Sequence, residues 1–334
     1  MSGELVAVLA VIFVAMAFDY TNGFHDAANA IATTVSTRAM TPRAALAMAA
    51  LGNFAGAHLG AGVAKTVGGG LVQLPTGMDS LGIVFAAVVG AIIWNLVTWY
   101  FGLPSSSSHA LIGGLVGATL AAAGTVLWDG ILDDVVLPMI VSPLIGFFLG
   151  FMAMLALVWA FRRGNPGKLN RGFRFAQIVS GAMLAVGHGM QDAAKTIGII
   201  VLALYVGGFQ DDPTTIPEWA FWTSAAVLAA GTYAGGWRII RTLGRKIIDM
   251  GPSEGFASAV VASLVLYFNA LVLHAPISTT HTITSAIMGV GATKRLNAVR
   301  WGVAGNIVGA WILTFPAAGS IAAIMYFVVR PVFN

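Results

Sequence analysis

Two short segments each place a carboxylate inside an otherwise apolar stretch. The first reads Asn-Gly-Phe-His-Asp-Ala-Ala-Asn at residues 22–29, and the second reads His-Gly-Met-Gln-Asp-Ala-Ala-Lys at residues 188–195. At one common offset, Asp26 aligns with Asp192 and Gly23 aligns with Gly189. A charge at membrane depth is expensive and is usually kept for a function. The repeated carboxylates therefore predict one functional site built from two related halves.

A second pair of motifs places hydroxyl groups directly after a helix break. Pro-Ser-Ser-Ser-Ser-His at 104–109 is echoed by Pro-Ile-Ser-Thr-Thr-His at 276–281. Serine and threonine are good N-caps, and a helix N-terminus offers free N–H groups with roughly half a positive charge. Two such termini meeting at mid-membrane predict an oxyanion site, although a capped turn alone would use the same residues. The expected anion ligands are Ser105, Ser106, Ser107, Ser108, Ser278, Thr279, Thr280 and Lys195.

The carboxylate motifs also predict a cation site. Asn29 lies three residues after Asp26, on the same helix face, and carboxylate and amide oxygens suit Na⁺ or a proton held on the aspartate. Lys195 replaces this asparagine in the second copy, where its ammonium substitutes for a cation or pairs with Asp192. Asp19 precedes the first motif and is expected in the same break. The expected cation residues are Asp26, Asn29, Asp192 and Asn22, supported by His25, His109, His281 and Gln191.

Composition excludes a soluble globular protein. The 334 residues are 58% hydrophobic and 9% charged, with a mean hydropathy of +0.86. There are no cysteines, which excludes disulfides and thiolate metal sites. The net charge of +4 is interpreted as basic cytoplasmic loops rather than nucleic-acid affinity. The N-terminal apolar segment predicts a first membrane helix rather than a cleaved signal.

Apolar runs and turn residues divide the chain into helices that would position these motifs. Because residues 3–37 exceed one straight span of about 20 residues, we expect a helix broken around Asn22-Gly23. A second broken helix is expected at 175–207. The other expected helices are 42–64, 80–101, 105–123, 135–161, 219–236, 252–272, 278–293 and 301–329.

Loop charges predict the topology. One assignment places 14 of the 17 basic residues on the cytoplasmic side and both termini outside. The two halves then enter from opposite sides, which predicts an all-α polytopic membrane protein with two inverted-topology repeats. Each repeat would contribute a broken helix and a helical hairpin meeting at the midplane, although parity does not separate hairpins from full crossings. The expected division is 1–161, a basic cytoplasmic linker at 162–174, and 175–334.

The motifs carry a family resemblance. Residues 19–33, with Thr-Arg-Ala-Met at 37–40 and the two Ser/Thr-His turns, closely resemble the inorganic phosphate transporter (PiT) family, and the bacterial low-affinity branch matches best. The resemblance covers essentially the whole chain. It implies a dimeric phosphate symporter in the cell (inner) membrane, with the hydroxyl turns facing phosphate. Asp26, Asn29 and Asp192 would serve the coupling cations.

Lys195 departs from the sodium-coupled pattern of that family, in which asparagine is expected. It resembles the proton-coupled bacterial branch, some members of which carry phosphate as a neutral complex with Mg²⁺ or another divalent metal. The coupling ion, H⁺ or Na⁺, stays open. No cofactor, structural metal or nucleic-acid partner is expected beside phosphate and the lipid bilayer.

Other functions fit parts of the pattern. The same geometry would hold sulfate, so a sulfate or related oxyanion symporter is the main alternative. An anion channel would ignore the cation gradient. An intramembrane enzyme could use Asp26, Asp192 and the histidines, but no nucleophile–base spacing is legible and an enzyme is not expected.

Overall fold

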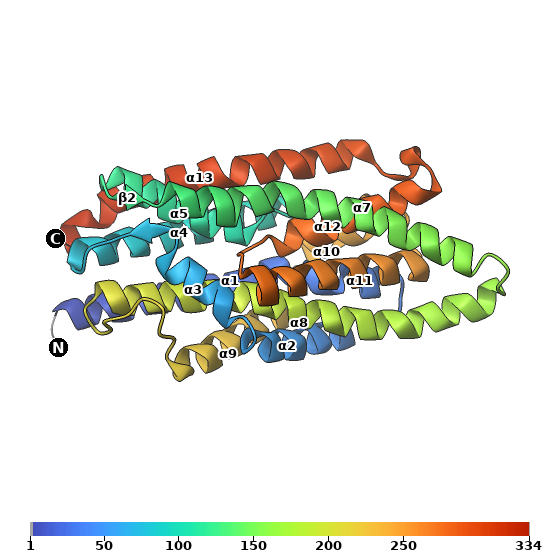
Figure 1. Ribbon diagram of the computed structural model, residues 1–334, viewed down its shortest axis with the longest axis horizontal. Helices are drawn as coiled ribbons and strands as arrows, with labels where there is room; N and C mark the ends of the chain where they lie inside the picture. Colours follow the sequence, from blue (N-terminus) through green and yellow to red (C-terminus); the bar gives the residue numbers. More distant parts are fainter. Residues whose placement is uncertain (1–2, 334) are drawn as a thin grey trace.

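The computed structural model describes residues 3–333, which form a long helical bundle with one two-stranded ribbon (Figure 1). Within this range, six helices are long and apolar enough to cross a membrane, or seven if one bent pair counts as a span. The fold is the predicted all-α membrane architecture. Its elements are α1 (Gly3–Ser36), α2 (Pro42–Ala57), α3 (Ala61–Gly69), β1 (Val72–Gln73), α4 (Met78–Phe101), α5 (Ser107–Ala121), β2 (Thr125–Val126), α6 (Trp128–Gly130), η1 (Ile131–Val136), α7 (Leu137–Ala160), α8 (Pro166–Val206), α9 (Glu218–Ala234), α10 (Trp237–Arg241), η2 (Thr242–Lys246), α11 (Pro252–Phe268), η3 (Asn269–Leu273), α12 (Thr279–Lys294), η4 (Leu296–Ala298) and α13 (Trp301–Phe333).

The helices that carry the carboxylate motifs are unbroken, so the breaks expected at Asn22-Gly23 and within 175–207 are wrong. α1 has 34 residues and α8 has 41. At 1.5 Å per residue α1 is about 51 Å long and simply extends beyond the hydrocarbon layer. Gly23 serves packing instead, because a Cβ there would lie 2.6 Å from the carbonyl oxygen of Leu228 on α9. The missing side chain lets two helices touch and does not bend the chain.

The interrupted helices lie elsewhere in the two halves. α2 and α3 are bent by 68° at a short break, and α9 and α10 are separated by Gly235-Gly236. Gly235 has φ +77°, a left-handed conformation that suits glycine. The start of α2 is as predicted, with Thr41 capping the backbone N–H of Ala44 and Pro42 in the first turn.

Two antiparallel helix pairs, α4/α5 and α11/α12, turn back inside the protein. Residues 104–108 and 275–278 at their tips are buried. Figure 1 shows the α4/α5 pair in the half of the bundle where α1 begins and the α11/α12 pair in the other half. The segments are therefore hairpins that approach each other from opposite ends, which is the arrangement that inverted repeats require.

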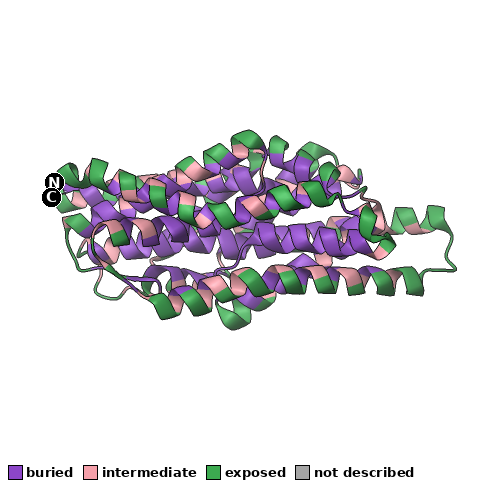
Figure 2. Cartoon of the chain, turned by 90° about the horizontal axis from the view of Figure 1, so that it is seen from above, coloured by how far each residue is buried: buried purple, intermediate pink, exposed green. Residues whose placement is uncertain are grey.

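The buried residues lie along the centre of the bundle for most of its length. Figure 2 shows buried residues along the central helices and exposed ones on the outer faces. In α8, 89% of the most apolar window is buried, against 22% in the spans of α7 and α13. Those two helices expose large apolar side chains such as Leu144, Phe148 and Ile312, as a lipid-facing surface would. α8 and the motif-bearing residues 22–34 of α1 thus lie inside the bundle, surrounded by other helices.

The two ends of the bundle carry different segments of the chain. The α7–α8 turn projects beyond the rest of the bundle, and α1 begins at the same end at which α13 finishes (Figure 1). Only residues 161–165 connect α7 to α8, and residues 166–174 of the expected linker form the first turns of α8. The repeat boundaries and the external placement of the termini stay predictions.

Candidate functional site

The two hairpin tips start their second helices in the same way. At α5 the Ser106 hydroxyl accepts a hydrogen bond from the backbone N–H of His109 at 3.2 Å. At α12 the Ser278 hydroxyl accepts one from the N–H of His281 at 3.1 Å. These two serines are helix caps, so their side chains hold the tips in shape. The following hydroxyls, on residues 107, 108, 279 and 280, are the ones aimed at the other elements.

Asp26, in α1, joins the two tips. Ser107 donates a hydrogen bond to Asp26 Oδ2, and Thr280 Oγ1 lies 3.4 Å from Oδ1. One turn later, the Asn29 amide donates to Thr279 Oγ1 at 3.2 Å and to Thr280 Oγ1 at 2.8 Å. Residues far apart in the sequence, from both halves of the chain, thus converge on one helix face.

The tips also contact each other directly. Ser108 Oγ donates to the carbonyl oxygen of Ile277 at 3.3 Å. All four of the aimed hydroxyl residues are at most 2% exposed. The predicted gathering of the hydroxyl turns around the first carboxylate is therefore present in the structure.

Both ring nitrogens of His25 have partners, so this side chain orients Asp26 and is not a free ligand. Its Nδ1 lies 2.7 Å from Asp26 Oδ1, and its Nε2 lies 3.0 Å from Thr98 Oγ1. Ser105 donates to the same threonine at 2.8 Å. Ser105 therefore lies behind the carboxylate. The sequence offered one signal for Thr98, a polar residue near the end of an apolar span that leads into the tip.

The second carboxylate, that of Asp192, has a positively charged partner. Lys195 Nζ lies 2.6 Å from Asp192 Oδ1, and His188 Nε2 lies 3.0 Å from Oδ2. Of the two roles open to Lys195, the structure shows the ion pair. His188, which sequence reasoning did not assign, begins the second motif and also contacts Asn53 Oδ1 through Nδ1 at 3.1 Å.

Gln191 fixes the second tip. Its amide donates to the carbonyl oxygen of Ala275 and accepts from the N–H of Ile277, both at 3.2 Å. Gln191 therefore supports the hairpin backbone.

The two motifs lie side by side. Asp26, His188 and Asp192 each offer one ligand atom, and these atoms lie within 4.8 Å of one another. All three side chains are buried. Two carboxylates this close repel each other unless cations or donors compensate them, and Lys195 supplies one positive charge. The group can accommodate a metal ion near the hydroxyl tips.

His109 and His281 pack against each other one turn behind the caps. Their rings are 4.7 Å apart and T-shaped, and His281 stacks on Trp311 at 3.9 Å. Within the described chain neither ring nitrogen of His109 has a hydrogen-bond partner. The two rings contribute to the contact between the two hairpins and do not touch Asp26.

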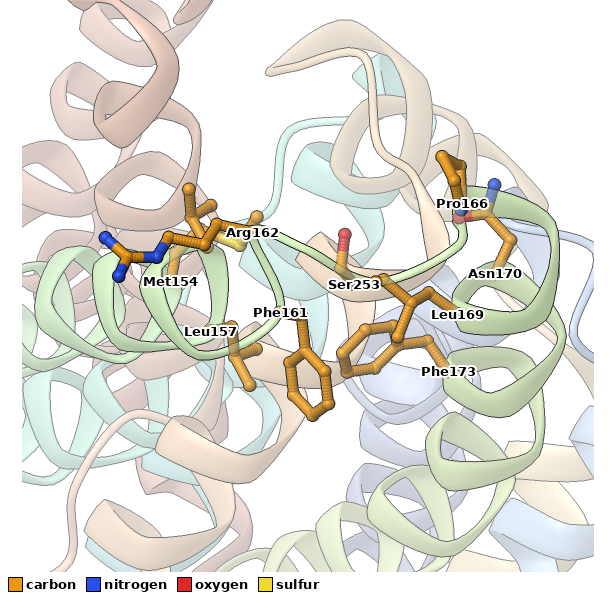
Figure 3. Close-up of a pocket in the computed structure, with 11 residues that line it drawn as sticks. Met154, Leu157, Phe161, Arg162, Pro166, Leu169, Asn170, Phe173 and Ser253 are labelled. Atoms are coloured by element: carbon orange, nitrogen blue, oxygen red, sulfur yellow. The ribbon is translucent and has the colours of Figure 1, made fainter.

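A surface pocket of about 320 Å³ lies away from this cluster (Figure 3). It is formed where α7, the α7–α8 turn and the start of α11 meet, with Phe161, Arg162, Leu169 and Phe173 in its wall. None of the expected ligand residues lines it, so the candidate site is the buried cluster at the tips.

Comparison with known proteins identifies the family. Residues 22–171 and 160–322 match the phosphate transporter family. A probable low-affinity inorganic phosphate transporter of Rhizobium meliloti is 48% identical over 319 residues, which cover 95% of this chain and 94% of the relative. The chain belongs to the phosphate transporter family. A probable low-affinity inorganic phosphate transporter of Bacillus subtilis is 42% identical over 98% of this chain and 99% of its own.

A solved structure supports the fold of this phosphate transporter family member. The structure described as the sodium-dependent phosphate transporter superposes with a TM-score of 0.90, covering 98% of this chain and 99% of that one at 24% identity. The suspected family is confirmed, and it is a transport family rather than an enzyme class.

Proposed function

We propose that this chain is a cation-coupled symporter that imports inorganic phosphate by alternating access. The observation that carries the proposal is the meeting of two hairpin tips at Asp26. Ser107 from one half and Thr280 from the other both face the carboxylate. Two helix N-termini and a buried carboxylate in one place supply an anion site and a cation site that share ligands.

Phosphate would be held by hydroxyls and backbone N–H groups. The candidates are Ser107, Ser108, Thr279 and Thr280, which are buried at the first turns of α5 and α12. An anion leaving water must recover its lost hydration, and helix N-termini are suited to this because their N–H groups point outward. The Lys195 ammonium adds a long-range positive charge, although its contact in this structure is with Asp192.

The coupling cation would be held chiefly by Asp26. Asp192 already has an ammonium at 2.6 Å, whereas the partners of Asp26 are hydroxyls and one imidazole. Asn29 Oδ1 has no hydrogen-bond partner within residues 3–333 and is one helical turn away. A proton or Na⁺ on this carboxylate would complete the phosphate site, so that neither ligand binds well alone.

A divalent metal that travels with phosphate is a second form of the cargo. The cluster of Asp26, His188 and Asp192 supports it, because carboxylates and imidazole beside an anion site can bind a metal–phosphate pair. In that form His188 would leave Asp192 for the metal. The family match does not favour sulfate or another oxyanion as the cargo.

Alternating access would come from rocking of one half against the other about the shared site. The α2–α3 and α9–α10 breaks flank the motif helices and are the natural hinges. Each positive charge moved inward gains roughly 2.3 kcal/mol per 100 mV, which supplies the drive. A homodimer and external termini complete the proposal.

Labelled phosphate uptake into proteoliposomes tests this function. Na⁺, H⁺ and Mg²⁺ gradients would be imposed one at a time, with unlabelled sulfate as competitor. A symporter gives saturable uptake that follows one cation gradient and resists sulfate. Uptake that is linear in phosphate and indifferent to every cation gradient would indicate a channel.

A further inference from the structure

The polar residues of α1 extend beyond the phosphate site. Asp19, Asn22, Asp26 and Asn29 are spaced by three, four and three residues, which places them on one face of the helix. Each is at most 2% exposed. This polar stripe therefore runs for about three turns inside the protein, and Asp19 is its end nearest the start of α1.

Asp19 is a buried carboxylate with an unused oxygen. Its Oδ2 accepts a hydrogen bond from Ser224 Oγ on α9 at 2.6 Å. Its Oδ1 has no partner in the described part of the chain. A second hydroxyl, that of Thr196 on α8, lies close enough to the carboxyl group to donate a hydrogen bond to it.

Asn22 adds further unused polar atoms to the same region. It is three residues after Asp19, and both atoms of its amide lack hydrogen-bond partners within residues 3–333. Carboxylate, amide and hydroxyl oxygens from three helices are the ligand set that a small hard cation prefers. Buried polar groups normally have partners, so several unpaired ones together point to a ligand.

Charge balance indicates the sign of that ligand. Asp19, Asp26, Asp192 and Lys195 are the carboxylates and ammonium groups at most 2% exposed in the described chain. With all three carboxylates ionised and His188 neutral, three carboxylates against one ammonium leave two negative charges before phosphate arrives. The charged groups that face Asp19 are Asp192 and Lys195 of α8, and α9 presents the neutral Ser224. Because Lys195 already pairs with Asp192, it does not neutralise Asp19.

We propose that Asp19 is the centre of a second cation site, which binds one monovalent cation, H⁺ or Na⁺, in each transport cycle. Ser224, Thr196 and Asn22 supply its other oxygens. Asn22 lies between Asp19 and Asp26, so the stripe also gives the cation a path toward the phosphate site. This inference rests on the proposed symport, because it adds a second coupled cation to it.

The test is the coupling ratio of Asp19→Asn in proteoliposomes. The steady-state phosphate accumulation would be measured against the imposed H⁺ or Na⁺ ratio, one cation at a time, and the slope of the logarithmic plot gives the number of coupled cations. We expect the slope to fall by one in Asp19→Asn, while phosphate exchange between equal pools stays measurable. Asp79→Asn, which alters an exposed aspartate at the start of α4, should keep the wild-type slope.

A thermal measurement separates a cation site from a structural carboxylate. In buffer without Na⁺ at high pH, Asp19→Asn should melt no lower than wild type, since it removes an uncompensated buried charge. Ser224→Ala should keep the slope and require several-fold more cation for half-maximal uptake. An unchanged slope in Asp19→Asn, or lost phosphate exchange together with a lower melting temperature, would overturn the inference alone. Wild-type vesicles that accumulate no phosphate under any cation gradient would overturn the proposed function with it.

Discussion

Replacing Lys195 by methionine should destabilise the protein by about 3–5 kcal/mol. The Lys195 ammonium lies 2.6 Å from Asp192 Oδ1, and both side chains are fully buried. Removing one member of a buried ion pair leaves an uncompensated charge, which typically costs about that much. Since whole domains are stable by only about 5–15 kcal/mol, the loss is a large fraction of the total.

Removing both charges should restore most of the lost stability. In Lys195→Met/Asp192→Asn no buried charge is left alone, so we expect a stability within about 2 kcal/mol of wild type. The resulting double-mutant cycle isolates the pair from other contacts of the two side chains. His188, 3.0 Å from the other carboxylate oxygen, can take up a proton and replace part of the lost charge. The single variant should therefore be less stable at pH 8.5 than at pH 6.

The measurement is reversible unfolding of detergent-purified protein, followed by tryptophan fluorescence. Arg300→Met is the matched control, because Arg300 pairs with Asp249 at 2.7 Å and both side chains are exposed. Such an exposed pair should contribute at most about 1 kcal/mol. The reasoning fails if Lys195→Met costs no more than this control, or if the double variant is less stable than the single one.

Two further predictions concern packing and the hydroxyl tips. Gly189→Ala should lower stability by about 1–3 kcal/mol, because its Cβ would meet the backbone of Asn53 in α2. Gly305→Ala, on the open face of α13, should instead gain up to about 1 kcal/mol from helix propensity. Melting curves of the two variants test this, and equal shifts would argue against close α2–α8 contact. Ser107→Ala should raise the KM for phosphate about tenfold, the equivalent of one charge-assisted hydrogen bond of about 1.5 kcal/mol. The exposed Ser320→Ala should leave the KM of uptake unchanged, and an unaltered KM in Ser107→Ala would remove this hydroxyl from the site.

The capped tips could be predicted from the sequence because their signals are local. Ser106 and Ser278 each precede an apolar helix and follow a proline-containing break, and N-cap chemistry depends only on such neighbours. The pairing of the tips with Asp26 was expected from the duplicated motifs, because equivalent residues of two inverted repeats would meet near a pseudo-two-fold axis. These features needed no long-range packing information.

Other features depended on contacts that the sequence does not reveal. The glycine in the first motif indicated a helix break, but Gly23 allows α9 to approach and α1 stays straight. The hydrogen-bond partners of His188 and Thr98 also could not be predicted, because a lone polar residue in an apolar span does not indicate which residue it will contact. Only the three-dimensional arrangement shows that Ser106 and Ser278 cap helices and that Ser107 faces Asp26.

The most direct test of the account is a structure determined with phosphate bound. The account predicts a tetrahedral anion between the first turns of α5 and α12, within about 2.7–3.2 Å of hydroxyl or N–H groups of residues 107–108 and 279–280. A phosphate bound away from both hairpin tips, or contacts from one tip alone, would contradict the claim that the two halves form one shared site.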